Sequence, residues 1–274
     1  MGKLRRAGYP IRRPDSDSTL PPRPDRFPLA PTYPEHRASM SSDFPSLSRS
    51  VEDYLKVIYA LSEQGEAAST SGIAATLDVQ PASVSGMIKR LAESGYVQHV
   101  PYRGVRLTES GTRAALRIVR RHRILETYLS ERLGYSWDDV HEEAERLEHA
   151  ASDRLIDRMA SALENPRHDP HGAPIPTRSG DVESTDHPSL AEVEPGDSVE
   201  IRAVQDDDSD RLRYMEARGL LPGVLLRIEA CAPFNGPVTV RVGGEDGESQ
   251  TVGHELASRI RVAPVDPTDS GIAH

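Results

Sequence analysis

The chain has 274 residues, enough for two or three folded domains, and 36% of them are hydrophobic. No apolar run approaches the roughly 20 residues that span a bilayer, the N-terminal arginines precede no apolar signal segment, and the single cysteine cannot form an internal disulfide. These features exclude a membrane-spanning protein and predict a cytoplasmic location. The net charge is −10, but residues 178–274 carry 9 basic and 19 acidic side chains, so a local nucleic-acid-binding surface elsewhere is not excluded.

Residues 1–46 contain 9 of the 22 prolines and show no helical or strand periodicity. This composition predicts a disordered arm. Its arginines could contact phosphates without sequence preference, or the arm could be a dispensable tail.

Residues 47–110 have the pattern of a winged helix-turn-helix domain. Apolar residues at three- and four-residue spacing predict an amphipathic helix from Ser50 to a stop at Gly65. A short helix to Leu77, a turn over residues 78–80 and a third helix that opens with Pro81 follow. Two short alternating runs around Gly104 then predict a β-wing.

Small and polar residues at the start of the third helix could reach base edges and thymine methyl groups, and basic residues there and in the wing could contact phosphates. Few long side chains are available to read bases, so sequence preference rests partly on methyl contacts and DNA shape. The alternative is a winged helix used only for protein contacts. The candidate DNA-binding residues are Gln80, Pro81, Ala82, Ser83, Ser85, Lys89, Arg90, Tyr102, Arg103 and Arg106.

The remainder of the chain predicts a helical domain followed by a small β domain. Residues 111–177 form a block with room for three helices, and residues 178–194 read as a polar linker. Residues 195–264 contain short alternating segments between Gly, Pro and Asp clusters, which favour a small barrel, and residues 265–274 form a tail. The predicted fold class is mainly α with a small all-β domain.

A potential metal site lies between His141 and His149. At 100° per residue, His141, Glu145, Glu148 and His149 fall within an arc of about 100° on one helix face. His122 and Glu126 form an i, i+4 pair that could reach the same cation or a neighbouring one. Carboxylate and imidazole ligands suit Mn²⁺, Fe²⁺, Co²⁺ or Zn²⁺. Two alternatives remain: a solvated, salt-bridged helix face, and a hydrolase, because Glu145-x-x-Glu148-His149 differs by one residue from a His-x-x-Glu-His zinc motif.

Together these motifs resemble the diphtheria toxin repressor family of metal-dependent transcriptional regulators, over about Ser48 to Val262. The resemblance implies a winged-helix DNA-binding domain, a helical dimerisation and metal-binding domain, and a C-terminal SH3-like (FeoA-like) domain. It is carried by residues 51–59, 81–91, 102–108, 121–123, 141–149 and 170–176 in that order.

The resemblance also implies the metal ligands. The primary site would comprise Asp53, Glu145, Glu148 and His149. An ancillary site would comprise His122, Glu126 and His141, with Asp208 as a weak candidate from the C-terminal domain.

Two positions bear on the choice of metal. Asp53 and Glu145 stand where iron-responsive members have Met and Cys, which favours Mn²⁺ and leaves Fe²⁺ as the alternative. Lys56 stands where the two-domain manganese branch has a second glutamate, which argues against a closely paired binuclear site.

The sequence therefore predicts a homodimeric regulator without enzymatic activity that binds an operator in double-stranded DNA. The most concrete form is a Mn(II)-activated repressor of metal-uptake genes; an Fe(II)-responsive regulator of the same family is the alternative. A metal-dependent hydrolase and a metal-independent winged-helix regulator remain as further alternatives.

Overall fold

The computed structural model describes residues 47–62, 67–100, 102–183, 186–206, 208–244 and 247–265. The predicted arm lies outside these residues, as does the predicted stop at Gly65. No helix in the described part of the chain is long and apolar enough to cross a membrane.

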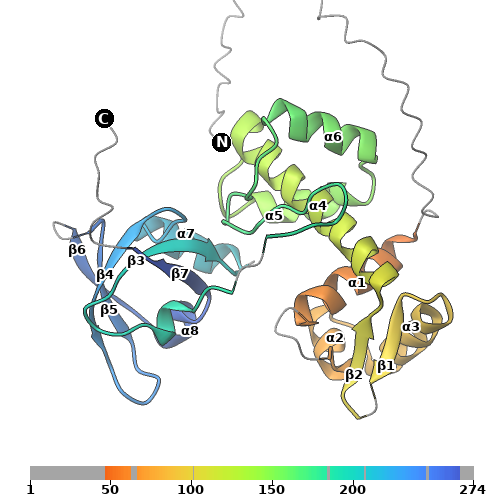
Figure 1. Ribbon diagram of the computed structural model, residues 1–274, viewed down its shortest axis with the longest axis horizontal. Coiled ribbons are helices and arrows are strands. Elements are labelled where there is room, and N and C mark those ends of the chain that lie inside the picture. Colours follow the sequence, from red (N-terminus) through yellow and green to blue (C-terminus); the bar gives the residue numbers. More distant parts are fainter. Residues whose placement is uncertain are drawn as a thin grey trace, which may run out of the picture. The chain divides into compact units, whose positions relative to one another are not determined.

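The N-terminal described segment folds as a winged helix-turn-helix (Figure 1). Ser69 caps the second helix by accepting a hydrogen bond from the amide of Gly72 at 3.0 Å, and Pro81 occupies the first turn of the third helix. Apolar side chains of all three helices and of the wing share one core that includes Leu55, Ile73 and Val84. The elements are α1 (Arg49–Ser62), α2 (Thr70–Thr76), α3 (Pro81–Glu93), β1 (Val97–Val100) and β2 (Gly104–Leu107).

Gly104 fixes the wing to the loop before α2. Its φ of +116° belongs to the region that favours glycine, and a Cβ there would lie 2.0 Å from the carbonyl oxygen of Ala68. Ala68 in turn exchanges backbone hydrogen bonds with Val105 at 2.9 and 3.0 Å. The short antiparallel hairpin is thereby held against the helical part of its domain.

The helical domain consists of a long helix with two shorter ones packed against it. Thr108 caps the long helix, and Gly134, with a φ of +74°, ends it. The long helix also packs against α1, so it connects the DNA-binding domain with the helical domain. The elements are α4 (Glu109–Leu133), α5 (Val140–Glu148) and α6 (Asp153–Ala162).

The C-terminal domain is a five-stranded antiparallel sheet in the order β6-β5-β4-β3-β7, curled around a core that includes Ile201, Val240 and Val262. This agrees with the predicted small β domain, but β6 and the helix α7 were not predicted. The elements are the 3₁₀ turn η1 (Leu190–Glu192), β3 (Ser198–Val204), α7 (Ser209–Ala217), β4 (Leu225–Cys231), β5 (Val238–Val242), β6 (Glu248–Val252), α8 (His254–Ala257) and β7 (Ile260–Pro264).

The loop after α6 attaches the C-terminal domain to the helical domain. The amide of Val204 donates to the carbonyl of His171 at 2.8 Å. Gly172, at a φ of +85°, lies so close to β3 that a Cβ would be 2.0 Å from the carbonyl oxygen of Arg202. Trp137, from the segment between α4 and α5, packs into the core of the C-terminal domain. The two domains are therefore joined by backbone contacts as well as by apolar packing.

Candidate metal centre

Three helices bring the predicted ligands together. Glu145 and Glu148 lie on α5 and His149 is its C-terminal cap; His122 and Glu126 lie on α4, which packs against α5. The remaining predicted ligand of the primary site, Asp53, comes from α1 in the DNA-binding domain. The donors form three groups within the described residues, and in each group one possible ligand atom per residue lies within 4.8 Å of the others: Asp53 with Glu148 and His149; His122 with His141 and Glu145; and Glu126 with Asp169 and His171.

The first group joins the DNA-binding domain to the helical domain. His149 Nε2 lies 2.9 Å from Asp53 Oδ1 and 3.3 Å from Glu148 Oε1. This nitrogen is buried and has no hydrogen-bond partner. The other ring nitrogen, Nδ1, lies 2.7 Å from Glu52 Oε2 and donates a proton there, which leaves Nε2 of the neutral ring as the nitrogen that can bind a cation. Glu148 is fully buried, and burial raises the pKa of Asp53. An unpartnered nitrogen facing two carboxylates fits a divalent cation.

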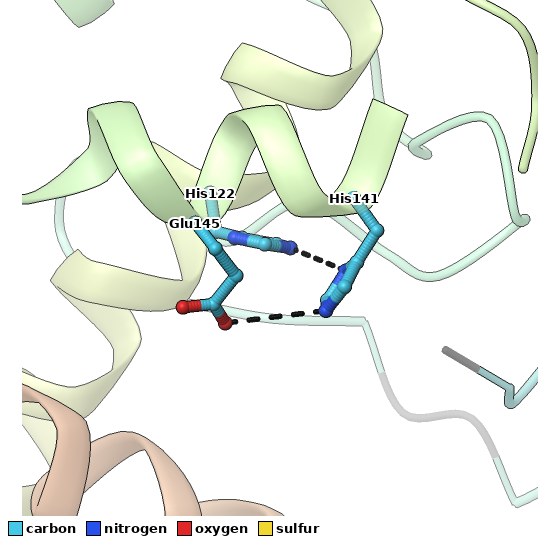
Figure 2. Close-up of side chains that lie close together, drawn as sticks. All are labelled: His122, His141 and Glu145. Carbon is cyan, nitrogen blue, oxygen red and sulfur yellow. Dashed lines mark hydrogen bonds and ion pairs between the residues drawn. The ribbon is translucent and has the colours of Figure 1, made fainter. Parts of the chain in front are cut away.

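The second group is shown in Figure 2, where the rings of His122 and His141 meet edge to face beside the carboxylate of Glu145. His122 Nε2 lies 3.0 Å from His141 Nδ1, and His141 Nε2 lies 4.0 Å from Glu145 Oε1. His122 also faces a carboxylate on each side, Glu148 at 2.7 Å and Glu126 at 2.9 Å. Burial by itself lowers the pKa of His122, but these two carboxylates outweigh it and raise the pKa to about 9.

Lys56 lies between the first two groups. Its ammonium donates to Glu148 at 2.9 and 3.0 Å, and it also contacts Glu145 Oε1. Burial lowers the pKa of Lys56, yet Glu148 and Glu145 raise it by more, so the lysine is charged. The same lysine lowers the pKa of Glu148, together with hydrogen bonding from His122, against the effect of burial. Glu145, predicted with Asp53 in the primary site, is thus turned toward Lys56 and His141 in this structure.

The third group includes two residues that the sequence analysis did not single out as ligands, Asp169 and His171. Both are buried, and both lie in the Pro- and Gly-rich loop that holds the C-terminal domain. Asp169 Oδ1 accepts the amides of His171 and Ala173, each at 2.9 Å. His171 Nε2 lies 3.0 Å from the carbonyl of Trp137, so Nε2 carries a proton and Nδ1 is the ring nitrogen available to an ion.

Burial and the charge of Glu126 raise the pKa of Asp169. A carboxylate and an imidazole separated by a proline and followed by a glycine were the available sequence signal for this group.

The composition of the three groups limits which ions they suit. All of these donors are carboxylate oxygens and imidazole nitrogens, and the only cysteine of the chain, Cys231, lies on β4 with its thiol directed at the carbonyl of Val193. Ligands of this kind suit Mn²⁺, Fe²⁺, Co²⁺ or Zn²⁺ and do not select for thiophilic ions.

Asp208, the weak candidate from the C-terminal domain, caps α7. Its Oδ1 accepts the amide of Arg211 at 3.0 Å, and its carboxylate belongs to none of the three groups. The side chain of Asp206 is buried and paired with Arg211 and Arg259. Asp208 therefore starts a helix, and the neighbouring Asp206 pairs with arginines.

The candidate DNA-binding residues all lie on the surface of the winged helix. Gln80 precedes α3, and the predicted residues of α3 are exposed while Val84, Ile88 and Leu91 face the core. Tyr102 and Arg103 form the tip of the wing, where Tyr102 is fully exposed, and Arg106 projects from β2. The Ser85 hydroxyl donates a hydrogen bond to the carbonyl of Pro81 at 3.1 Å.

Family models match the winged-helix, helical and β domains of this chain separately. Three family models match: "Iron dependent repressor, N-terminal DNA binding domain" over residues 46–105, "Iron dependent repressor, metal binding and dimerisation domain" over residues 108–177, and "FeoA domain" over residues 189–264. The iron-dependent repressor IdeR of Mycobacterium tuberculosis is 31% identical over 229 residues, which cover 78% of this chain and 96% of IdeR. The transcriptional regulator MntR of Oceanobacillus iheyensis is 38% identical over 114 residues, covering 42% of this chain and 77% of MntR.

Solved structures give the same result. A manganese-dependent transcriptional repressor in complex with manganese superimposes with a TM-score of 0.73 at 40% identity, covering 78% of this chain and 100% of that chain. The manganese regulator SloR superimposes with a TM-score of 0.67 at 34% identity, covering 78% and 98%. These matches confirm the predicted fold class and the resemblance stated from the sequence motifs. The chain belongs to the diphtheria toxin repressor family of iron- and manganese-dependent transcriptional regulators.

Proposed function

We propose that this protein is a homodimeric, metal-activated repressor that binds operator DNA through its winged helix. Mn²⁺ is the proposed activating ion, and genes for metal uptake are the proposed targets. Its relatives include both iron- and manganese-dependent repressors, and one similar structure is a complex with manganese. The hard and borderline donors of the three groups support manganese over an ion that requires sulfur ligands.

The observation that carries the proposal is the convergence of Asp53 with Glu148 and His149. Asp53 belongs to α1, which shares its core with the recognition helix α3, whereas the other two residues belong to the end of α5. These three residues would hold the cation, whose charge would neutralise carboxylates from both domains. Asp53 then remains beside His149, and α1 keeps a fixed position against α5. Two recognition helices of a dimer would thereby be held at the spacing of successive major grooves.

The contacts of Lys56 support a single ion beside Asp53. Its ammonium already contacts one carboxylate of each of the first two groups, Glu148 and Glu145. A second divalent cation between these carboxylates would meet that positive charge. Lys56 therefore takes the place of a second cation, and Glu145 completes the primary site only when it turns away from Lys56.

We further assign Glu126, Asp169 and His171 as a second ion position. Glu126 was predicted as an ancillary ligand with His122 and His141, but here its carboxylate also faces the loop at the C-terminal domain. His171 has the orientation common to metal-binding histidines, with its other ring nitrogen bonded to a backbone carbonyl. An ion there would hold the loop that docks the C-terminal domain.

The test is DNA binding as a function of metal. Fluorescence anisotropy would follow the EDTA-treated protein on DNA from its own upstream region and from nearby transporter promoters, without metal, with Mn²⁺ and, anaerobically, with Fe²⁺. Binding that requires either ion supports the proposal, and tighter binding at equal free Mn²⁺ than free Fe²⁺ supports manganese. Binding that is unchanged by EDTA would instead identify a metal-independent regulator.

A matched pair of variants tests the assignment of ligands on α5. Glu148→Ala removes a fully buried carboxylate of the first group, whereas Glu142→Ala removes an exposed carboxylate from the same helix. Only Glu148→Ala should abolish the response to metal, while size-exclusion chromatography shows an intact dimer for both. A normal metal response of Glu148→Ala would overturn the ligand assignment.

The geometry does not favour a hydrolase. A metal-dependent hydrolase needs a carboxylate free to take a proton from water, but Glu148 is fully buried and bonded to Lys56 and His122. Turnover of ester, peptide or phosphate substrates with Zn²⁺ would reverse this conclusion.

A further inference from the structure

Glu52, a carboxylate in the first turn of α1 that the sequence analysis did not assign to the metal site, contacts a ligand of the first metal group. Glu52 is buried, although it immediately precedes Asp53 near the helix start. Its Oε2 lies 2.7 Å from His149 Nδ1. A carboxylate can only accept there, so the ring must carry its proton on Nδ1.

The other ring nitrogen of His149, Nε2, is the one that faces the first metal group. In the neutral ring with its proton on Nδ1, His149 Nε2 carries the lone pair that a metal ion requires, and it lies buried without a hydrogen-bond partner beside Asp53 and Glu148. Were the proton on Nε2 instead, that nitrogen would donate to a carboxylate and could not bind an ion. Two consecutive residues of α1, Glu52 and Asp53, therefore face the two nitrogens of one ring.

Glu52 is itself held in place from outside the centre. Arg121 of α4 donates from Nη1 to Glu52 Oε1 at 3.1 Å, and from Nε and Nη2 to Asp153 Oδ1 at 3.1 and 2.9 Å. Asp153 is the first residue of α6, and its carboxylate also accepts a hydrogen bond from Arg117. The carboxylate that orients His149 is thus fixed by an ion-pair chain across α4 and α6.

We propose that Glu52 is a positioning residue that fixes the tautomer and orientation of His149 for metal binding. This inference rests on the proposed function insofar as an ion binds beside Asp53. Because Glu52 belongs to the DNA-binding domain and His149 to the helical domain, the same contact also makes a correctly oriented ligand depend on the position of α1. A carboxylate that supports a metal-binding histidine in this way typically changes metal affinity by 10- to 100-fold when it is removed.

The experiment compares Glu52→Ala with Glu52→Gln in the full chain. Glutamine keeps an oxygen that accepts from Nδ1, whereas alanine does not. Nitrogen-15 NMR of the imidazoles reads the tautomer directly in EDTA-treated protein, and a His149→Asn variant assigns the resonance. Titration with Mn²⁺ against a fluorescent chelator gives the dissociation constant, and the visible absorption of bound Co²⁺ reports the ligand geometry.

We expect wild type and Glu52→Gln to show the Nδ1–H tautomer. Glu52→Ala should lose this preference, bind Mn²⁺ 10- to 100-fold more weakly and change the Co²⁺ spectrum. Glu93→Ala, an exposed glutamate of the same domain that pairs only loosely with Lys89, is the control for removing a carboxylate and should match wild type.

Two results would overturn the inference. One is a wild-type tautomer in Glu52→Ala; the other is an equal loss of affinity in Glu52→Gln and Glu52→Ala, which would make the charge rather than the acceptor decisive. Failure of wild-type protein to bind Mn²⁺ at all would refute the proposed function, and the NMR comparison would still decide the role of Glu52.

Discussion

Replacing Lys56 with methionine should destabilise the metal-free protein and strengthen metal binding at the same time. The ammonium contacts both Glu148 oxygens and one oxygen of Glu145. Glu148 is fully buried, while the side chains of Lys56 and Glu145 are 19% and 35% exposed. Loss of one partner of a buried ion pair costs about 3–5 kcal/mol, and solvent screening at the two exposed ends reduces this to about 2 kcal/mol. For a folded region of this size, the melting temperature should fall by about 4–8 °C.

The effect on manganese has the opposite sign, because the variant removes a positive charge beside the carboxylates that would bind the ion. Two unit charges about 4 Å apart interact by about 4 kcal/mol at an effective dielectric constant of 20. Since the lysine can partly withdraw toward solvent, we expect about 1.4 kcal/mol, which is a tenfold lower dissociation constant. Thermal unfolding in EDTA and in a Mn²⁺ series, together with a competition titration, measures both quantities.

Lys89→Met is the matched control, because Lys89 is exposed and its nearest carboxylate, Glu93, is 4.0 Å away. It should change neither quantity. The reasoning is wrong if Lys56→Met binds Mn²⁺ as weakly as wild type or more weakly, since the ammonium would then support the bound ion instead of opposing it.

Three further predictions concern the metal ligands, DNA binding and the pH dependence of stability. Asp53→Ala should abolish metal-stimulated DNA binding and leave the dimer folded, as judged by anisotropy and size-exclusion chromatography; retention of a Mn²⁺ response would contradict the bridging role of α1. Arg103→Ala at the wing tip should weaken binding to all DNA sequences alike and reduce the slope of log affinity against log salt by about 1; a loss confined to one sequence would instead mark a base contact. The pKa of His122 is about 9 in the folded protein and ordinarily 6.5, so its protonation stabilises the metal-free fold by up to about 3 kcal/mol below pH 6.5, and this contribution is lost as the pH rises through 9. The melting temperature of the EDTA-treated protein should therefore fall between pH 7 and 9.5, and His122→Asn should flatten this dependence.

Most of the secondary structure follows from local patterns in the sequence. The three- and four-residue spacing in α1 and α3, the proline at the start of α3 and the glycine in the wing each have one dominant structural meaning, and the corresponding elements were predicted within a few residues. The strand β6 was not predicted because its sequence, Glu248–Val252, is polar and only Val252 is buried. Helix α7 was not predicted because Asp208 was interpreted as a metal ligand, whereas it caps the helix.

The residues of the first two groups were predicted from the sequence, whereas Asp169, His171 and the contacts within each group were not. Helical spacing predicts that Glu145, Glu148 and His149 share one face of α5; the structure groups Glu148 and His149 with Asp53, and Glu145 with His122 and His141. The position of Lys56 between two carboxylates depends on how α1 packs on α5, and no local pattern encodes it. The assignment of individual ligands remains a prediction for the variants above to test.

The loop that carries His171 has a consequence for genetics. Val204 of β3 donates its amide proton to His171, and Gly172 lies against the backbone at Arg202. Substitutions in the C-terminal domain that displace β3 at Arg202 or Val204 would therefore displace this loop as well. In a screen for loss of the metal response, such mutations would be recovered alongside those in the ligands and would be mistaken for them.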